Sequence, residues 1–202
     1  MPTNRRNVKS DAGSHPADAH ERARDFLGEA EIARLLKAAK RGRHGVRDHL
    51  LLLLMFRHGL RVSEAIALRR SDADLDQARL WISRLKNGLS GEQPIAGDEL
   101  RAIGRWLALR DDTLPWLFVS ERRQPLTRQT VNYIVARAGK QAKPGHINPH
   151  MLRHSCGFAH ANTGHDLRLS QDYLGSGSAT YRALHAHSRR SVRRALVEGT
   201  NK

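Results

Sequence analysis

Apolar residues recur at helical spacing along most of this chain. In residues 24–39 they fall on one face of a helix and the polar residues on the other. The run from Leu50 to Phe56 is apolar on all sides, which predicts a buried helix that Gly59 caps. Shorter patterns of the same period predict further helices over residues 61–70, 97–110, 125–142, 147–164 and 166–175.

Residues 78–97 follow a different pattern. Leu80 and Ile82 alternate with polar residues, and the following K-N-G-L-S-G stretch is typical of a turn. This alternation predicts a small β-hairpin or a three-stranded antiparallel sheet. We therefore expect a fold that is mainly α with a small antiparallel β-sheet.

The net charge of the chain indicates a class of binding partner. Thirty-five Lys and Arg stand against 20 Asp and Glu among 202 residues, giving a formal charge of +15. Such an excess favours a polyanionic partner, and nucleic acid is the first candidate. The alternative is a merely soluble basic surface. Residues 1–20 are predicted to be a disordered basic arm.

The apolar runs and the cysteine content bear on location. The longest run, Leu50–Phe56, is too short to cross a bilayer, and the first ten residues lack the apolar stretch of a signal peptide. Cys156 is the only cysteine, which excludes an internal disulfide framework and fits a reducing environment. We expect a cytoplasmic protein without membrane contact, in which Cys156 is a small core residue.

A candidate phosphate site lies at the start of the helix that Pro149 begins. His150 and Arg153 are three residues apart, on one side of its first turn, where the free N–H groups also favour an anion. A solvated helix face would look the same. Arg61 follows a turn glycine between apolar residues, and Lys86 lies at the predicted hairpin tip.

Four short motifs connect these residues. H-G-L-R-V-S-E, R-L-K-N-G, P-H-M-L-R-H-S and Q-D-Y-L-G occur in the order and approximate spacing of the tyrosine recombinases of the phage integrase family. The resemblance covers residues 26–175 and is greatest to the short recombinases that invert fimbrial promoter segments. It implies a catalytic domain over residues 21–175, acting on double-stranded DNA with inverted-repeat sites as a homo-oligomer.

The resemblance also implies roles for single residues. Arg61 and Arg153 would be the two catalytic arginines, His150 the histidine, and Lys86 the hairpin lysine. In this family a tyrosine attacks a DNA phosphodiester, forming a 3′-phosphotyrosyl bond and releasing a 5′-hydroxyl. Two guanidiniums suit the non-bridging oxygens, and a lysine can protonate the leaving oxygen. No metal and no cofactor is implied, because the phosphotyrosine conserves the bond energy.

The tail departs from the family pattern. After Gly175 the family has a His or Trp, and nine residues later the nucleophilic Tyr; this chain has Ser176 and His185 there. Tyr181 lies four residues too early and is a weak alternative nucleophile. His185 with His187 lacks the acidic or thiol partner of a metal site.

A shift of the reading frame accounts for this tail. Moving the frame by one base from Ser176 to Glu198, with allowed codons, can give a His after Y-L-G followed by RDPRHTVHYTRTAGARFEGLW, with Tyr nine places after that His. We therefore predict that residues 176–202 are a frameshifted tail and that the chain is a recombinase by descent, disabled in this form. Two alternatives stay open: a DNA-binding pseudo-recombinase that regulates without cutting, and an unrelated basic helical module that binds RNA or protein.

Overall fold

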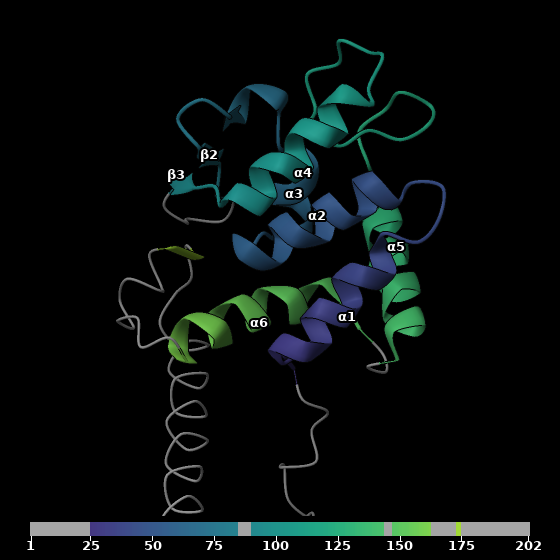
Figure 1. Ribbon diagram of the computed structural model, residues 1–202, viewed down its shortest axis with the longest axis vertical. Coiled ribbons are helices and arrows are strands. Elements are labelled where there is room, and N and C mark those ends of the chain that lie inside the picture. Colours follow the sequence, from purple (N-terminus) through teal and green to yellow (C-terminus); the bar gives the residue numbers. More distant parts are fainter. Residues whose placement is uncertain (1–24, 85–89, 144–146, 163–172, 175–202) are drawn as a thin grey trace, which may run out of the picture.

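The computed structural model describes residues 25–84, 90–143, 147–162 and 173–174. Within these ranges the chain is mainly helical, with one small sheet at its edge (Figure 1). The elements are α1 (Glu29–Ala39), α2 (Gly45–Arg57), α3 (Val62–Ala67), the 3-10 helix η2 (Arg70–Asp72), β1 (Ala73–Asp74), β2 (Arg79–Ile82), β3 (Gly91–Pro94), α4 (Gly97–Ala108), α5 (Arg128–Ala142) and α6 (Pro149–Asn162).

Helix α2 forms the centre of the core. Its leucines from Leu50 to Leu54 are all buried, as the all-round apolar run predicts. Helices α1, α4 and α6 pack against α2, and α5 packs against α1 (Figure 1). A helix that is apolar on every side needs neighbours on every side, and this arrangement supplies them.

The end of α2 determines where the next helix starts. Gly59 has φ +56°, and Leu60 N donates to Met55 O at 3.0 Å, which closes the helix in a left-handed turn. A Cβ on Gly59 would lie 2.0 Å from Leu174 Cδ2. Glycine is therefore required here both by the backbone angle and by the close approach of Leu174, and the predicted cap is confirmed.

The sheet is antiparallel and has the order β1-β2-β3. Leu80 pairs with Gln93, and both Leu80 and Ile82 are buried on the same face. The predicted small sheet is thus confirmed. Helix α3 ends at Ala67, earlier than the pattern predicts, because Leu68 turns to an extended conformation and its carbonyl accepts from Leu117 N at 2.8 Å.

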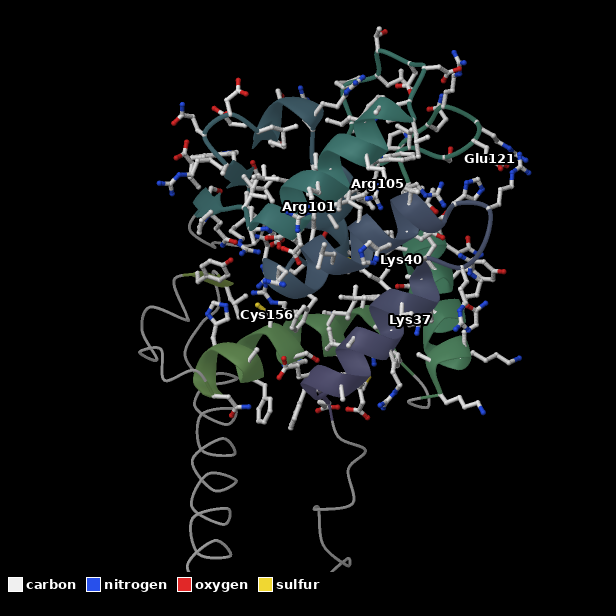
Figure 2. All side chains as sticks on the ribbon, in the orientation of Figure 1. Lys37, Lys40, Arg101, Arg105, Glu121 and Cys156 are labelled. Carbon is white, nitrogen blue, oxygen red and sulfur yellow. The ribbon has the colours of Figure 1, made fainter. Side chains whose placement is uncertain are left out.

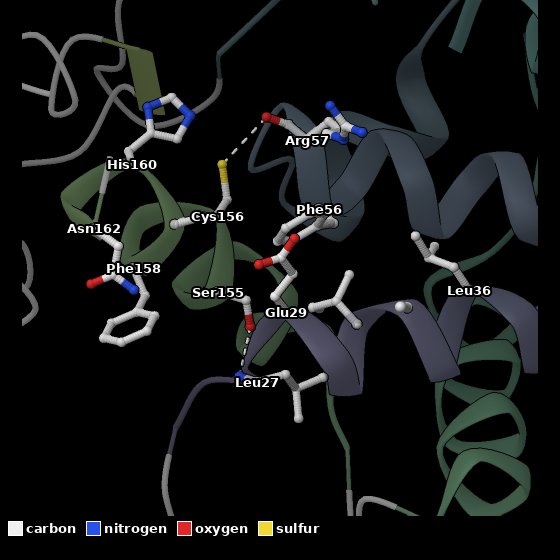
Figure 3. Close-up of a pocket in the computed structure, with 13 residues that line it drawn as sticks. Leu27, Glu29, Leu36, Phe56, Arg57, Ser155, Cys156, Phe158, His160 and Asn162 are labelled. Atoms are coloured by element: carbon white, nitrogen blue, oxygen red, sulfur yellow. Dashed lines mark hydrogen bonds between the residues drawn. The ribbon is translucent and has the colours of Figure 1, made fainter. Parts of the chain in front are cut away.

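Two predicted helix starts and the cysteine are also confirmed. Thr127 accepts a hydrogen bond from Thr130 N at 3.1 Å, and Asn148 Oδ1 accepts one from Met151 N at 3.2 Å. Cys156 is buried and its thiol donates to a backbone carbonyl of α2, as Figure 3 shows. Burial raises the pKa of this thiol to about 12, which fits a core residue and not a nucleophile.

The ends of the chain stay outside this description. The arm predicted for residues 1–20 and the tail predicted for residues 176–202 both lie beyond the described residues. In the part of the chain that the structure describes, no helix is long and apolar enough to cross a membrane.

Candidate active site

Arg61 is the residue from which the candidate site is built. It precedes the first residue of α3, and both its backbone and its side chain bond to Glu64, which lies in the first turn of that helix. Arg61 N donates to Glu64 Oε2 at 2.9 Å, and Arg61 Nη1 donates to Glu64 Oε1 at 2.7 Å. One carboxylate therefore fixes the start of the helix and the direction of the guanidinium, which stays 25% exposed.

Glu64 gathers more than one arginine. Its side chain is buried, and Arg84 Nη1 donates to Oε2 at 2.9 Å while Arg153 Nη1 lies 3.9 Å from the same oxygen. Burial alone would raise the pKa of Glu64, but the hydrogen bonds from Arg61 and the charge of Arg84 hold it below its ordinary value. Glu64 is thus ionised and holds cations from three separate segments of the chain.

Arg153 reaches this carboxylate from α6. Its guanidinium is buried and donates to Gly59 O and, at 2.5 Å, to Leu174 O. Because Gly59 ends the turn before Arg61, the two predicted catalytic arginines share both a carboxylate and a stretch of backbone. The structure thus brings these two arginines to one carboxylate.

His150 lies on the open side of the same region. It is exposed in the first turn of α6, and with Arg61 and Arg128 it lines a pocket of about 530 Å³. Ser63, Asn132 and Asn148 complete the polar lining, and no acidic residue is among the described residues that form it. A concave surface with two guanidiniums, an imidazole and no carboxylate is suited to a phosphate group.

The remaining predicted residues lie outside the described part of the chain. These are Lys86, Ser176, Tyr181 and His185. The strands on either side of Lys86 are paired as predicted, and Arg84 N donates to Ser90 Oγ at 2.9 Å at the base of that hairpin. The catalytic roles of Arg61, Lys86, His150 and Arg153 stay predictions.

Sequence reasoning missed three contributors to the site. Glu64 could have been found, because an acid three residues after a helix start is the signal of a capping interaction. Arg84 continues the buried alternation of Leu80 and Ile82, so its position required a buried acid as partner. Arg128 gave no signal among the many arginines of the chain.

The comparisons with known proteins agree with this geometry. The phage integrase family matches residues 25–191, and the chain belongs to that family. The type 1 fimbriae regulatory protein FimB of Escherichia coli K12 is 46% identical over 162 residues, which are 78% of this chain and 81% of that protein. The regulatory protein FimE of the same strain is 41% identical over 158 residues, 75% of this chain and 80% of that protein.

Solved structures show the same fold. The crystal structure of the XerA recombinase has a TM-score of 0.74 and is 27% identical, covering 88% of this chain and 65% of that one. The XerH recombinase, solved in a complex with its DNA substrate, has a TM-score of 0.72 at 22% identity, covering 85% of this chain and 52% of that one. The predicted resemblance to the tyrosine recombinases is confirmed, and the unrelated basic module is excluded.

Proposed function

We propose that this chain is a site-specific DNA recombinase by descent, which binds double-stranded DNA at inverted-repeat sites as a homo-oligomer in the cytoplasm. The observation that carries the proposal is the pocket shared by Arg61 and His150, with Arg153 joined to Arg61 through Glu64. In the reaction, negative charge grows on the two non-bridging oxygens of the phosphate, and the arginines stabilise that charge.

The proposal includes a defect in the tail. Ser176 and His185 stand where the family has a phosphate-binding His or Trp and its nucleophilic Tyr, and a frameshift after Gly175 accounts for both. Tyr173 does not replace the missing tyrosine. Burial raises its pKa above the usual range, and its hydroxyl lies 3.3 Å from the carbonyl of Arg57, to which it donates.

Repairing the tail tests the proposal directly. We define the repaired chain as residues 1–175 followed by His and RDPRHTVHYTRTAGARFEGLW. A nicked DNA substrate that traps the covalent intermediate should give a clear protein–DNA adduct with the repaired chain and none with the present chain. His185→Tyr alone should give little adduct, because it leaves Ser176 in place and the surroundings of the tyrosine unrestored; a misplacement of about 1 Å can cost about 100-fold.

Three results would contradict the proposal. A strong adduct from the present chain that Tyr181→Phe abolishes would make Tyr181 the nucleophile. No adduct from the repaired chain, together with salt-sensitive binding to duplex DNA, would favour the regulator that occupies its sites without cutting. Binding that does not respond to salt would contradict both.

The surface charges outside the pocket supply a comparison for the binding measurement. Four exposed side chains lie on one side of the molecule (Figure 2): Lys37 of α1, Lys40 directly after that helix, and Arg101 and Arg105 of α4. Neither helix lines the pocket. If the pocket is the phosphate site, these four residues contribute to DNA binding only through their long-range field.

A further inference from the structure

Arg84 is a buried arginine between the end of β2 and Lys86. It follows Leu80 and Ile82 on the buried face of β2, and its guanidinium side chain is only 1% exposed. An arginine is almost never buried unless its donors are satisfied. Its contacts therefore explain why it is there.

The guanidinium of Arg84 joins two segments that are far apart in the sequence, residues 58–64 and the turn of Tyr173 and Leu174. Nη1 donates to Glu64 Oε2 at 2.9 Å; Nη2 donates to His58 O at 2.9 Å and to Tyr173 O at 2.7 Å. The first contact holds the carboxylate that orients Arg61. The last contact holds the short helical turn of Tyr173 and Leu174, which comes immediately before Gly175.

A second donor reaches the same carbonyl. Gln93 Nε2 donates to Tyr173 O at 2.7 Å, and Gln93 Oε1 lies 2.8 Å from His58 Nδ1. His58 Nε2 in turn lies 3.0 Å from Glu99 Oε1, at ion-pair distance and fully buried. This order fixes the amide of Gln93, so that its NH₂ group faces Tyr173 and its oxygen faces His58.

We propose that Arg84 is a positioning residue that joins the Tyr173–Leu174 turn to the carboxylate of the active site. The proposal rests on the function proposed above. One guanidinium holds Glu64, and through it Arg61, at the same time as Tyr173 O, while Arg153 holds Leu174 O. Arg61, Arg153 and the Tyr173–Leu174 turn are thereby fixed relative to one another. A lysine would keep the charge but not the planar fork that reaches both partners.

Cys156 provides a reporter for this junction. It is the only cysteine of the chain, and it is packed in one apolar cluster with Leu174, Tyr173 and Phe56. Its thiol is almost fully buried, and it also lines the pocket between α1 and α6 (Figure 3). The labelling rate of the parent therefore includes opening on either side, and the increase caused by a variant that loses a contact to Tyr173 O measures how much more often the Tyr173–Leu174 turn separates from α2 and α6.

The test compares Arg84→Lys with Arg47→Lys. Arg47 is the matched control: its side chain is also buried, and it bonds to a buried acid, Asp48, and to the backbone carbonyl of Val119. We expect Arg84→Lys to raise the labelling rate of Cys156 in the native protein about tenfold or more. This factor corresponds to the loss of one hydrogen bond made by a charged group. This increase should persist at low urea with little dependence on urea, as local opening does. Arg47→Lys should raise it only as far as its global stability falls.

A second variant keeps the test decisive if Arg84→Lys does not fold. Gln93→Met removes the other donor to Tyr173 O and leaves Arg84 and Glu64 in place. We expect about a threefold to tenfold faster labelling, since a neutral hydrogen bond contributes less than a charged one. If the labelling rate of Arg84→Lys rises only as far as its global free energy of unfolding falls, the proposal is overturned. If Arg84→Lys does not fold, an unchanged labelling rate in Gln93→Met overturns it.

The repaired chain gives an independent readout. Arg84→Lys should lower the rate of single-turnover adduct formation at saturating DNA about tenfold or more, while the Kd for duplex DNA stays within about twofold, because Arg84 orients groups and touches no phosphate. An equal loss in Arg47→Lys would overturn it. If the unmodified repaired chain forms no adduct, the proposed function fails, and the labelling experiment still decides whether Arg84 holds the turn.

Discussion

Among the residues that the structure describes, Glu64 beside the pocket and Asp48 at the start of α2 are both buried carboxylates that hold arginines. Arg47 lies 2.8 Å from Asp48 Oδ1, and Arg137 of α5 lies 2.7 Å from Oδ2. Arg61 and Arg137 are alike in one respect, because each is partly exposed, 25% and 30%, and each binds a buried acid. Seen alone, either pair could be an active-site arginine or a structural ion pair.

The surroundings of the two pairs separate them. The hollow beside Asp48 is also lined by Glu121, labelled in Figure 2, which forms ion pairs with Arg43 at 3.0 Å and with His44 at 2.9 Å. The pocket beside Arg61 has no acid among its described lining residues. A buried carboxylate fixes the direction of an arginine in both places. The hollow beside Asp48 places two carboxylates among its arginines, where they oppose an anionic ligand, whereas the described lining of the pocket beside Arg61 has arginine and no carboxylate.

Removing the acid from the structural pair should have the largest effect on stability. Asp48→Asn leaves the buried guanidinium of Arg47 without a counter-charge, which costs about 3–5 kcal/mol of unfolding free energy. Urea denaturation measures this loss. In the repaired chain, adduct formation by Asp48→Asn should stay within about threefold of the parent at a temperature where the variant is folded. Glu64→Gln should lower both stability and adduct formation, and equal behaviour of the two variants would remove the distinction.

The exposed arginines provide the corresponding test of catalysis. In the repaired chain, Arg61→Ala should slow adduct formation about 100- to 1000-fold, the usual cost of losing one donor that stabilises transition-state charge. Arg137→Ala is matched in exposure and in its bond to a buried acid, and it should change the rate by less than about threefold. A loss at Arg137 as large as that at Arg61 would show that both clusters act on the DNA phosphate.

The same two clusters show what sequence reasoning can reach. Arg61 was predicted because a short motif places it after a turn glycine. The start of α6 was predicted because Asn148 and Pro149 are strong helix-start signals. Arg47 and Asp48 are adjacent polar residues just before the apolar run of α2, and no local pattern shows that they are buried together. Their burial depends on α5, which lies far along the chain.

The sheet and the tail mark two other limits. The alternation around Leu80 and Ile82 was sufficient to predict β2, but β1 has only two residues and forms because residues 75–78 turn the chain back, so that β2 pairs with it. The tail was predicted to be frameshifted because Ser176 and His185 replace the residues of the family, and this prediction depends on the family pattern. Physical patterns predicted the elements, whereas the family motif predicted which side chains matter.

The salt dependence of DNA binding should distinguish charges in the pocket from charges on the outer surface. Arg128→Gln removes a charge that lines the pocket, and we expect the slope of log K against log salt to fall by about one unit. Arg105→Gln removes an exposed charge on α4 that does not line it, and the slope should stay nearly constant. Filter binding to duplex DNA at several salt concentrations measures both. Equal slopes for the two variants would place the phosphates elsewhere on the surface.

The smallest expected effect is the response of Glu64 to acid. The pKa of Glu64 is held below its ordinary value, so the folded state favours the ionised form and the unfolded state binds the proton more readily. The contribution of Glu64 to stability is therefore complete above the unfolded pKa of about 4.3 and is lost as the pH falls through the lower folded pKa. The gap in unfolding free energy between the parent and Glu64→Gln should be constant from pH 7 to pH 5 and should narrow from pH 4 to pH 3. Urea denaturation of both proteins across this range measures the gap. A gap that keeps its full size at pH 3 would mean that Arg61 and Arg84 do not bind Glu64 through its charge.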